Sequence, residues 1–192
     1  MERSSACAMR TKRKMANALK EIMNTTSFEK ITVSDIAEVS NIHRQTFYYH
    51  FQDRYELLDW LLYQELLVPL LEGLSFENMY DKLQQMFTTM RADKRFYQNA
   101  LKINGEDLTR YVIRVATEQF TEVVKNIGKT NGIESIDSES DKVIAEFFGY
   151  GITGVVMSWA GRGMKETPGV MTQRIQNLFN ACQKIAVKKY EL

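Results

Sequence analysis

The chain has 192 residues, of which 44% are hydrophobic and 26% charged, so it can bury a core and is too apolar for a disordered chain. No apolar run approaches the ~20 residues of a membrane span, and the opening MERSSACAMRTKRK has no apolar signal-peptide core, so we expect no membrane partner. The net charge of +1 hides a basic N-terminal part, because residues 1–54 hold nine Lys and Arg against six Asp and Glu. Such an excess attracts phosphate backbone, although a solvated tail would have the same charge.

The first third of the chain predicts three helices. Apolar residues recur at helical spacing over residues 9–24. In ITVSDIAEVS, Thr32 and Asp35 form a variant of the capping box, which opens a short second helix. Asn41 suits a tight turn because asparagine tolerates the left-handed conformation, and a third helix begins near His43.

The remainder continues as helices. Asp53 and Glu56 make a second cap-plus-third-residue pair and open a long helix that Pro69 ends or kinks. Two prolines and ten glycines are too few for a turn-rich β fold, so we expect an all-α protein. A polar loop is predicted at residues 131–140, and further helices at residues 76–90, 96–103, 106–127, 141–160 and 168–190.

Enzyme chemistry has weak support in this sequence. GYGITG, residues 149–154, matches the G-x-G-x-x-G fingerprint, but a helical pattern rather than a strand precedes it, so nucleotide binding is the least favoured alternative. His43 and His50 have no nucleophile or carboxylate at recognisable spacing. Cys7 and Cys182 lack zinc spacing and indicate a reducing, cytoplasmic compartment. We expect no catalytic residues, no metal and no cofactor.

The segment RQTFYYHF, residues 44–51, has two chemically different faces. On a helix, Phe47 and Phe51 fall on one side and suit a core, while two tyrosines and polar side chains fall on the other. A capped helix, a turn and a second helix with a polar outer face form a helix-turn-helix, whose second helix reads bases in the major groove. Arg44 suits guanine, Gln45 suits adenine, and Thr46 offers a hydroxyl and a methyl group. Alternatively, the tyrosines cover a domain interface.

ITVSDIAEVSNIHRQTFYYHFQDRYELL resembles the signature of TetR-family transcriptional regulators over roughly residues 10–60. The resemblance implies a helix-turn-helix DNA-binding domain at residues 1–52, a helical effector-binding and dimerisation domain at 53–192, about nine helices in all, and a homodimer on a near-palindromic, double-stranded DNA operator. Asn41, His43 and Arg54 replace the family's usual glycine, Ser/Thr cap and lysine, and His43 is the poorer cap. The DNA-contacting positions carried over, with His43 added, are Ser34, His43, Arg44, Gln45, Thr46, Tyr48, Tyr49, His50 and Arg54.

Beyond residue 60 the resemblance is to a smaller subgroup. FYQNAL and the late GYGITGVVMSW with AGRGMK are similar to a subgroup that includes the dihydroxyacetone-kinase operon activator, so regulation can be activation or repression. The family implies control by a small-molecule effector or a protein co-regulator. Tyr97, Tyr111 and Arg114 are candidate pocket residues, or else surface residues, and an inward Arg114 would favour an anionic or polyol ligand.

The last two helices are the candidate dimer interface. The helix before the end is apolar on too many sides for one contact surface, so we expect it to be buried against both its own subunit and a second copy. A helical adaptor whose aromatic face binds another protein is the alternative to a DNA-binding dimer. The predicted interface residues are Phe147, Gly151, Gly154, Val155, Trp159, Ile175, Phe179 and Cys182.

Overall fold

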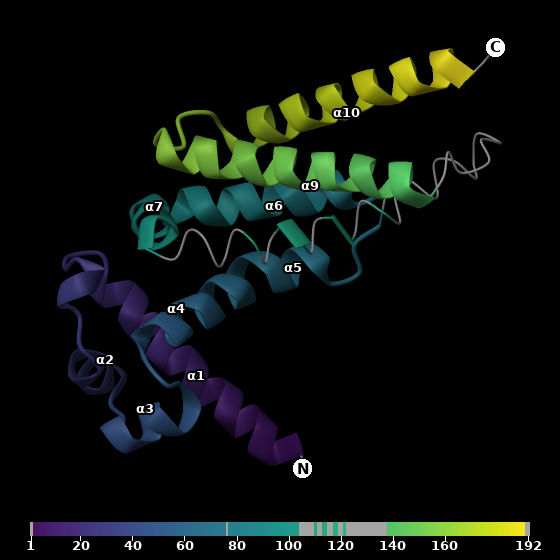
Figure 1. The fold of residues 1–192 in the computed structure, drawn as a ribbon. Coiled ribbons are helices and arrows are strands. Elements are labelled where there is room, and N and C mark those ends of the chain that lie inside the picture. The colour runs from purple at the N-terminus through teal and green to yellow at the C-terminus, as the bar shows by residue number, and fades with distance from the viewer. Residues whose placement is uncertain are drawn as a thin grey trace. The chain divides into compact units, whose positions relative to one another are not determined.

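The computed structural model describes residues 2–75, 77–103, 110, 113–114, 117–118, 121 and 138–190, and the side chains of these residues except 2–5, 138, 140–141 and 182–190. Every regular element in these residues is helical, which confirms the predicted all-α class (Figure 1). The chain forms two compact units. The first comprises Met1–Pro69 and Asp93–Gly105, and the second comprises Leu70–Ala92 and Glu106–Leu192.

The first unit is built around α1, which packs against the three helices that follow it. Met15 and Leu19 of α1, and Met23 just beyond its end, are buried at four-residue spacing. Ile36 of α2 and Phe47 of α3 are fully buried as well. The first helix is longer than the sequence predicted, because it begins at residue 2 rather than 9. The unit's elements are α1 (Glu2–Ile22), a 3-10 turn η1 (Phe28–Lys30), α2 (Val33–Ser40), α3 (Arg44–His50), α4 (Arg54–Leu62), η2 (Tyr63–Leu67) and α7 (Lys94–Ile103).

The predicted long helix after Asp53 contains a π turn rather than a simple end at Pro69. Five residues, Tyr63–Leu67, are π-helical and lead into α5 (Val68–Leu71), which contains the proline. The Val68 N–H donates to the Tyr63 carbonyl, one residue further back than in an α-helix. Proline lacks an N–H and crowds the preceding turn, so a widened turn just before it lets the helix continue.

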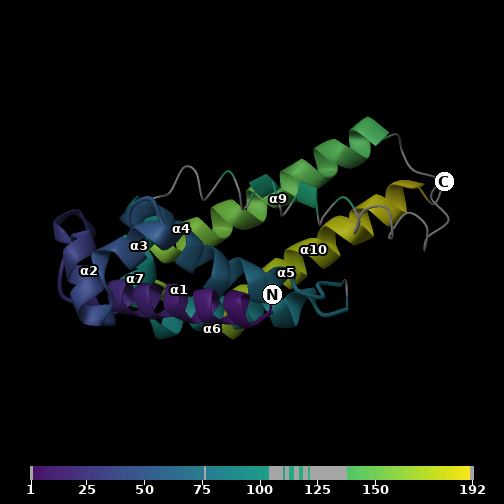
Figure 2. The ribbon, with the colours of Figure 1, turned by 90° about the horizontal axis from the view of Figure 1, so that it is seen from below.

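The second unit contains α6 (Met79–Ala92), α9 (Ser138–Gly161) and α10 (Pro168–Tyr190). Aromatic pairs join its helices: the ring centroids of Phe87 and Trp159 are 5.0 Å apart, and those of Phe148 and Phe179 are 5.4 Å apart. The helices α9 and α10 run antiparallel and diverge away from the turn that connects them (Figures 1 and 2). In that turn Gly163 has φ 92°, a left-handed conformation that glycine adopts without strain.

Two predicted segments lie mostly outside the described residues. Of the helix predicted at 106–127, the described positions 110, 113–114, 117–118 and 121 are helical. Of the loop predicted at 131–140, residues 131–137 are outside the description, and 138–140 already belong to α9 rather than to a loop.

One helix, α9, is long and apolar enough over Lys142–Gly161 to cross a membrane by length and composition. No uninterrupted apolar run marks this segment in the sequence, because glycine, threonine and serine are interspersed among its apolar residues. A single such helix is weak evidence for a membrane span, since core helices of soluble proteins can be as long and as apolar. Because 28% of the segment is buried in the described structure, α9 has a large apolar surface left to cover.

Candidate nucleic-acid interface

Short-range contacts fix both ends of α2, the second of which is the turn to α3. The Asp35 N–H donates to Thr32 Oγ1 at 3.2 Å, and Asp35 Oδ2 accepts from the Thr32 N–H at 2.7 Å, which completes the capping box. These bonds hold the pKa of Asp35 below its ordinary value. At the other end of α2, Asn41 adopts the left-handed conformation with φ 52° and ψ 53°. The two helices therefore leave the turn in directions that short-range chemistry determines.

The helix α3 presents a core face and an outer face. Phe47 is fully buried, and its ring centroid lies 5.9 Å from that of Phe51, which is also buried. On the outer face, Tyr49 is 83% exposed and Tyr48 is 51% exposed. Arg44 and Gln45 are exposed as well. Two phenylalanines thus anchor α3 so that its tyrosines and first polar residues face outward.

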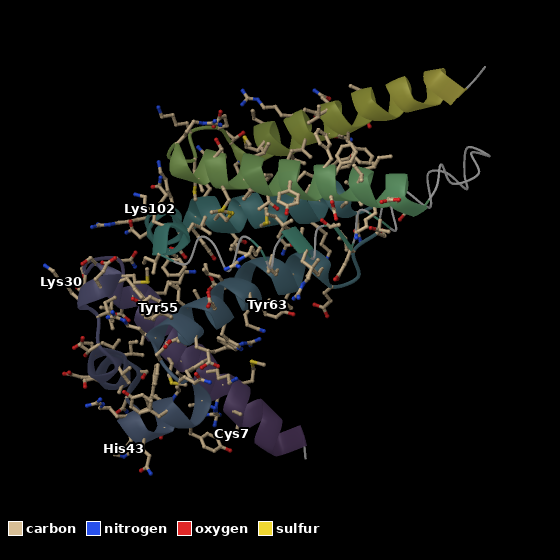
Figure 3. All side chains as sticks on the ribbon, in the orientation of Figure 1. Cys7, Lys30, His43, Tyr55, Tyr63 and Lys102 are labelled. Atoms are coloured by element: carbon tan, nitrogen blue, oxygen red, sulfur yellow. The ribbon has the colours of Figure 1, made fainter. Side chains whose placement is uncertain are left out.

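The first turn of α3 has no side-chain cap, but a tyrosine one turn later contacts its arginine. His43 is the N-cap residue and makes no capping hydrogen bond. Its side chain is exposed and lies beside α3, away from α1 (Figure 3). Arg44 Nη2 donates to the Tyr48 hydroxyl at 3.4 Å, and its guanidinium lies 6.0 Å from the Tyr48 ring centroid. Such a contact holds the guanidinium beside the outer face. Thr46 is half-buried and Ser34, near the start of α2, is exposed.

His50, the last residue of α3, is half-buried beside Tyr49, with ring centroids 4.9 Å apart. Burial and the nearby charge of Lys12 lower the pKa of His50 below its ordinary value of 6.5. An approaching phosphate would act in the opposite direction and raise this pKa.

Arg54 has an intramolecular role that sequence reasoning missed. Its Nη1 donates to the carbonyls of Phe28 and Glu29 at 3.1 Å and also to that of Ile31. The guanidinium lies 4.9 Å from the Phe28 ring centroid and 5.4 Å from that of Tyr55. It therefore satisfies the carbonyls of η1 and ties this turn to the start of α4. The η1 turn carries no strong sequence signal, and a DNA contact by Arg54 would have to use its other nitrogens.

The three candidate pocket residues have different surroundings. Tyr97 in α7 is fully buried within the first unit and donates from its hydroxyl to Glu65. Burial and this contact raise the pKa of Tyr97, so the hydroxyl remains protonated. Arg114 belongs to the second unit and is exposed, and Tyr111 lies outside the described residues. The predicted pocket therefore stays a prediction, because Tyr97 and Arg114 belong to different units and Tyr111 is not described.

The predicted interface residues divide between surface and interior. Phe147 is 70% exposed, and Gly151, Gly154 and Val155 are exposed with it along one face of α9. Trp159, Ile175 and Phe179 are instead buried in the core of their own subunit. Helical periodicity placed them on apolar faces correctly, but it could not tell which of those faces packs inside the subunit. The side chain of Cys182 is outside the description.

The glycine motif at 149–154 lies inside α9, so its backbone N–H groups belong to the helix and are not free to hold a phosphate. Gly149 is buried at a close helix approach, because a Cβ there would lie 2.7 Å from Thr117 Oγ1. Within the described residues, no group of three or more His, Cys, Asp or Glu could hold a metal ion.

Comparisons with known proteins agree with this geometry. Residues 17–61 match the family described as bacterial regulatory proteins of the tetR family, and residues 77–181 match a transcriptional regulator C-terminal region. The chain is 29% identical over 94 residues, 49% of its length, to the HTH-type dhaKLM operon transcriptional activator DhaS of Lactococcus lactis subsp. lactis (strain IL1403). That match spans about half, 50%, of the relative's length.

Two solved structures are similar in fold over most of the chain. The dihydroxyacetone kinase operon activator DhaS has a TM-score of 0.74 and 23% identity, and the match covers 91% of this chain and 97% of DhaS. Native NalD, the secondary repressor of the MexAB-OprM multidrug efflux pump in Pseudomonas aeruginosa, has a TM-score of 0.58 and 14% identity, with 90% and 96% covered. Both likenesses extend across the two compact units.

Proposed function

The chain belongs to the tetR family of bacterial transcriptional regulators, and we propose that it is a cytoplasmic homodimer that binds a near-palindromic DNA operator through α3. The observation that carries the proposal is the outer face of α3. There Arg44, Gln45, Tyr48 and Tyr49 are exposed while Phe47 fixes the helix from behind. Arginine and glutamine side chains at the start of such a helix can read base edges, and tyrosine hydroxyls can bind phosphates.

The exposed apolar face of α9 supports the homodimer. Its members recur at three- and four-residue spacing and have no cover within the described subunit: Val143, Phe147, Tyr150, Gly151, Gly154 and Val155. A side chain added at Gly151 or Gly154 would meet nothing within 4 Å, so the backbone of α9 is open at these two positions. A second copy related by a two-fold axis can approach this backbone closely and bury both faces. A dimer is also what a near-palindromic site requires.

The second unit would hold the control of DNA binding. Two buried hydroxyls in it, those of Tyr80 and Thr153, have no hydrogen-bond partner. Buried polar groups are costly without a partner, which supports a small effector with hydrogen-bonding groups, such as a polyol, as the occupant. A thermal-shift screen tests this: polyols should stabilise the protein and lose that effect in Thr153→Val. Stabilisation by hydrophobic cations alone would contradict it. A protein co-regulator is the other candidate for this control.

Selection from random double-stranded DNA tests the function as a whole. We expect the intact protein to enrich a sequence with two similar half-sites in inverted orientation. Affinity for that sequence should fall steeply with salt, because binding releases counterions from phosphates. A helical adaptor that binds protein through its aromatic face would enrich no sequence and show no salt-dependent affinity, and that result would exclude the proposal.

A further inference from the structure

One basic residue of α1 differs from its neighbours in the direction it faces. Lys12 precedes the buried residues Met15, Ala16 and Leu19 by three, four and seven positions, so it lies on the core face of α1, one turn before the core begins. Lys12 is half-buried, whereas Arg10, Arg13 and Lys14 are exposed. The basic N-terminus is therefore not a uniform solvated tail, and one of its cations is directed towards the other helices of the first unit.

The ammonium group of Lys12 is held by aromatic rings at the end of the recognition helix α3. Its Nζ lies 5.1 Å from the ring centroid of Phe51, the C-cap residue of α3, and 5.8 Å from that of Trp60 in α4. Contacts of this kind orient a cation without neutralising it. No Asp or Glu within the described residues forms an ion pair with Lys12. The positive charge is thus fixed in place and uncompensated.

His50 lies at the same end of α3 as this cation, one residue before the ring of Phe51 on which the ammonium group rests. Its ring is half-buried, and burial first and the charge of Lys12 second lower its pKa. Two groups that can both donate to an anion therefore occupy the C-terminal end of α3. Beside them is the exposed ring of Tyr49, on the face of α3 that would enter the major groove.

We propose that Lys12 and His50 together bind one backbone phosphate of DNA at the C-terminal end of α3. This inference rests on the proposed function. It adds to that function a cation from α1 that binds the DNA backbone near the C-terminal end of α3. A phosphate contact carries no sequence information, so its role is to fix the register of α3 in the groove. The competing explanation is that the lysine stem merely covers the rings of Phe51 and Trp60.

Salt dependence separates the two explanations. Affinity of the full-length protein is measured on the sequence enriched from random DNA, between about 50 and 200 mM NaCl, by fluorescence anisotropy. For Lys12→Met, which keeps an apolar stem of similar length, we expect affinity at 100 mM salt to fall roughly tenfold. The slope of log affinity against log salt should shrink by about 1.8, the value for two lost phosphate contacts, one in each subunit of the dimer. The loss should be the same for operator and mismatched sequences.

Two matched variants complete the test. Lys12→Arg should restore the slope, because a guanidinium also binds phosphate and contacts aromatic rings. Lys14→Met removes the same charge from an exposed position of the same helix and should leave the slope at its original value. If the salt slope of the Lys12→Met protein is unchanged, the inference is wrong, and the lysine stem only packs on the rings of Phe51 and Trp60. If the unmodified protein selects no DNA sequence, the proposed function fails, and this inference fails with it.

Discussion

The ammonium nitrogen of Lys20 lies 2.7 Å from Glu65 Oε2, an ion pair that joins α1 to the π turn η2. Lys20 also pairs with Asp93 at 2.8 Å, and Glu65 accepts from the buried hydroxyl of Tyr97. Burial alone would lower the pKa of Lys20, but the hydrogen bonds and charges of Asp93 and Glu65 outweigh it and raise this pKa. Three separate segments of the first unit therefore meet at one charged group.

The first prediction concerns the stability of this cluster. Glu65→Gln should lower the free energy of unfolding by about 1–3 kcal/mol, because it leaves a partly buried ammonium group and a buried hydroxyl poorly paired. Asp93→Asn should lower the free energy of unfolding by less, because Asp93 is 48% exposed and Lys20 still pairs with Glu65 in this variant. Urea unfolding followed by circular dichroism measures both values. Equal losses in the two variants would show that the Tyr97 contact adds nothing.

The second prediction concerns base reading. Gln45→Ala should relax specificity at one base pair in each half-site, at a cost of about 1–3 kcal/mol there, because an amide can read adenine. Tyr49→Phe should instead weaken binding to all sequences alike, since a hydroxyl on a phosphate is blind to sequence. Repeating the selection from random DNA with each variant measures the difference. An unchanged preferred sequence for Gln45→Ala would remove Gln45 from the base contacts.

The recognition element was predictable because its determinants are local. Thr32 and Asp35 bond to each other three residues apart, and the Asn41 N–H bonds to carbonyls three and four residues before it. The structure shows the cap and the left-handed turn that these residues predict. Arg54 was not predictable in the same way, because its partners are carbonyls more than twenty residues away. The spacing of Lys12 to the core residues of α1 was visible in the sequence, but its aromatic neighbours come from α3 and α4.

The faces of α9 show a second limit. Apolar residues surround this helix, so periodicity alone cannot tell the face that packs inside the subunit from the face that remains exposed. The structure separates Trp159, which is fully buried, from Phe147, which is 70% exposed. A surface of this kind emerges only from tertiary packing.

The third prediction concerns pH. A bound phosphate favours imidazolium, so the pKa of His50 should be higher in the complex than in the free protein, where burial and Lys12 lower it. The resulting gain in affinity is fully present below the free-protein pKa and is lost as pH rises through the pKa of the complex. Affinity should therefore fall between about pH 5 and 8, as measured by anisotropy at constant ionic strength. His50→Gln should flatten this dependence, and His43→Gln is the comparison, because His43 is the exposed histidine at the other end of α3. A steep profile that survives in His50→Gln would assign the proton uptake elsewhere.

The last prediction concerns the dimer. Phe147→Glu places a charge on the exposed apolar face of α9, so the subunit should keep its fold while the interface with a second copy is lost. Gly154→Leu should act in the same direction, because the added side chain meets nothing within 4 Å in its own subunit and would hold a partner's helix away from α9. Phe179→Glu is the contrasting control. Phe179 is 6% exposed in the core of its own subunit, so this change should unfold the second unit.

Sedimentation velocity at micromolar concentration, with thermal unfolding of each variant, distinguishes loss of the dimer from loss of the fold. Loss of operator binding should accompany loss of the dimer in Phe147→Glu, since one subunit presents one recognition helix to a two-fold site. If Phe147→Glu remains dimeric and still binds the operator, the exposed face of α9 is not the interface between copies.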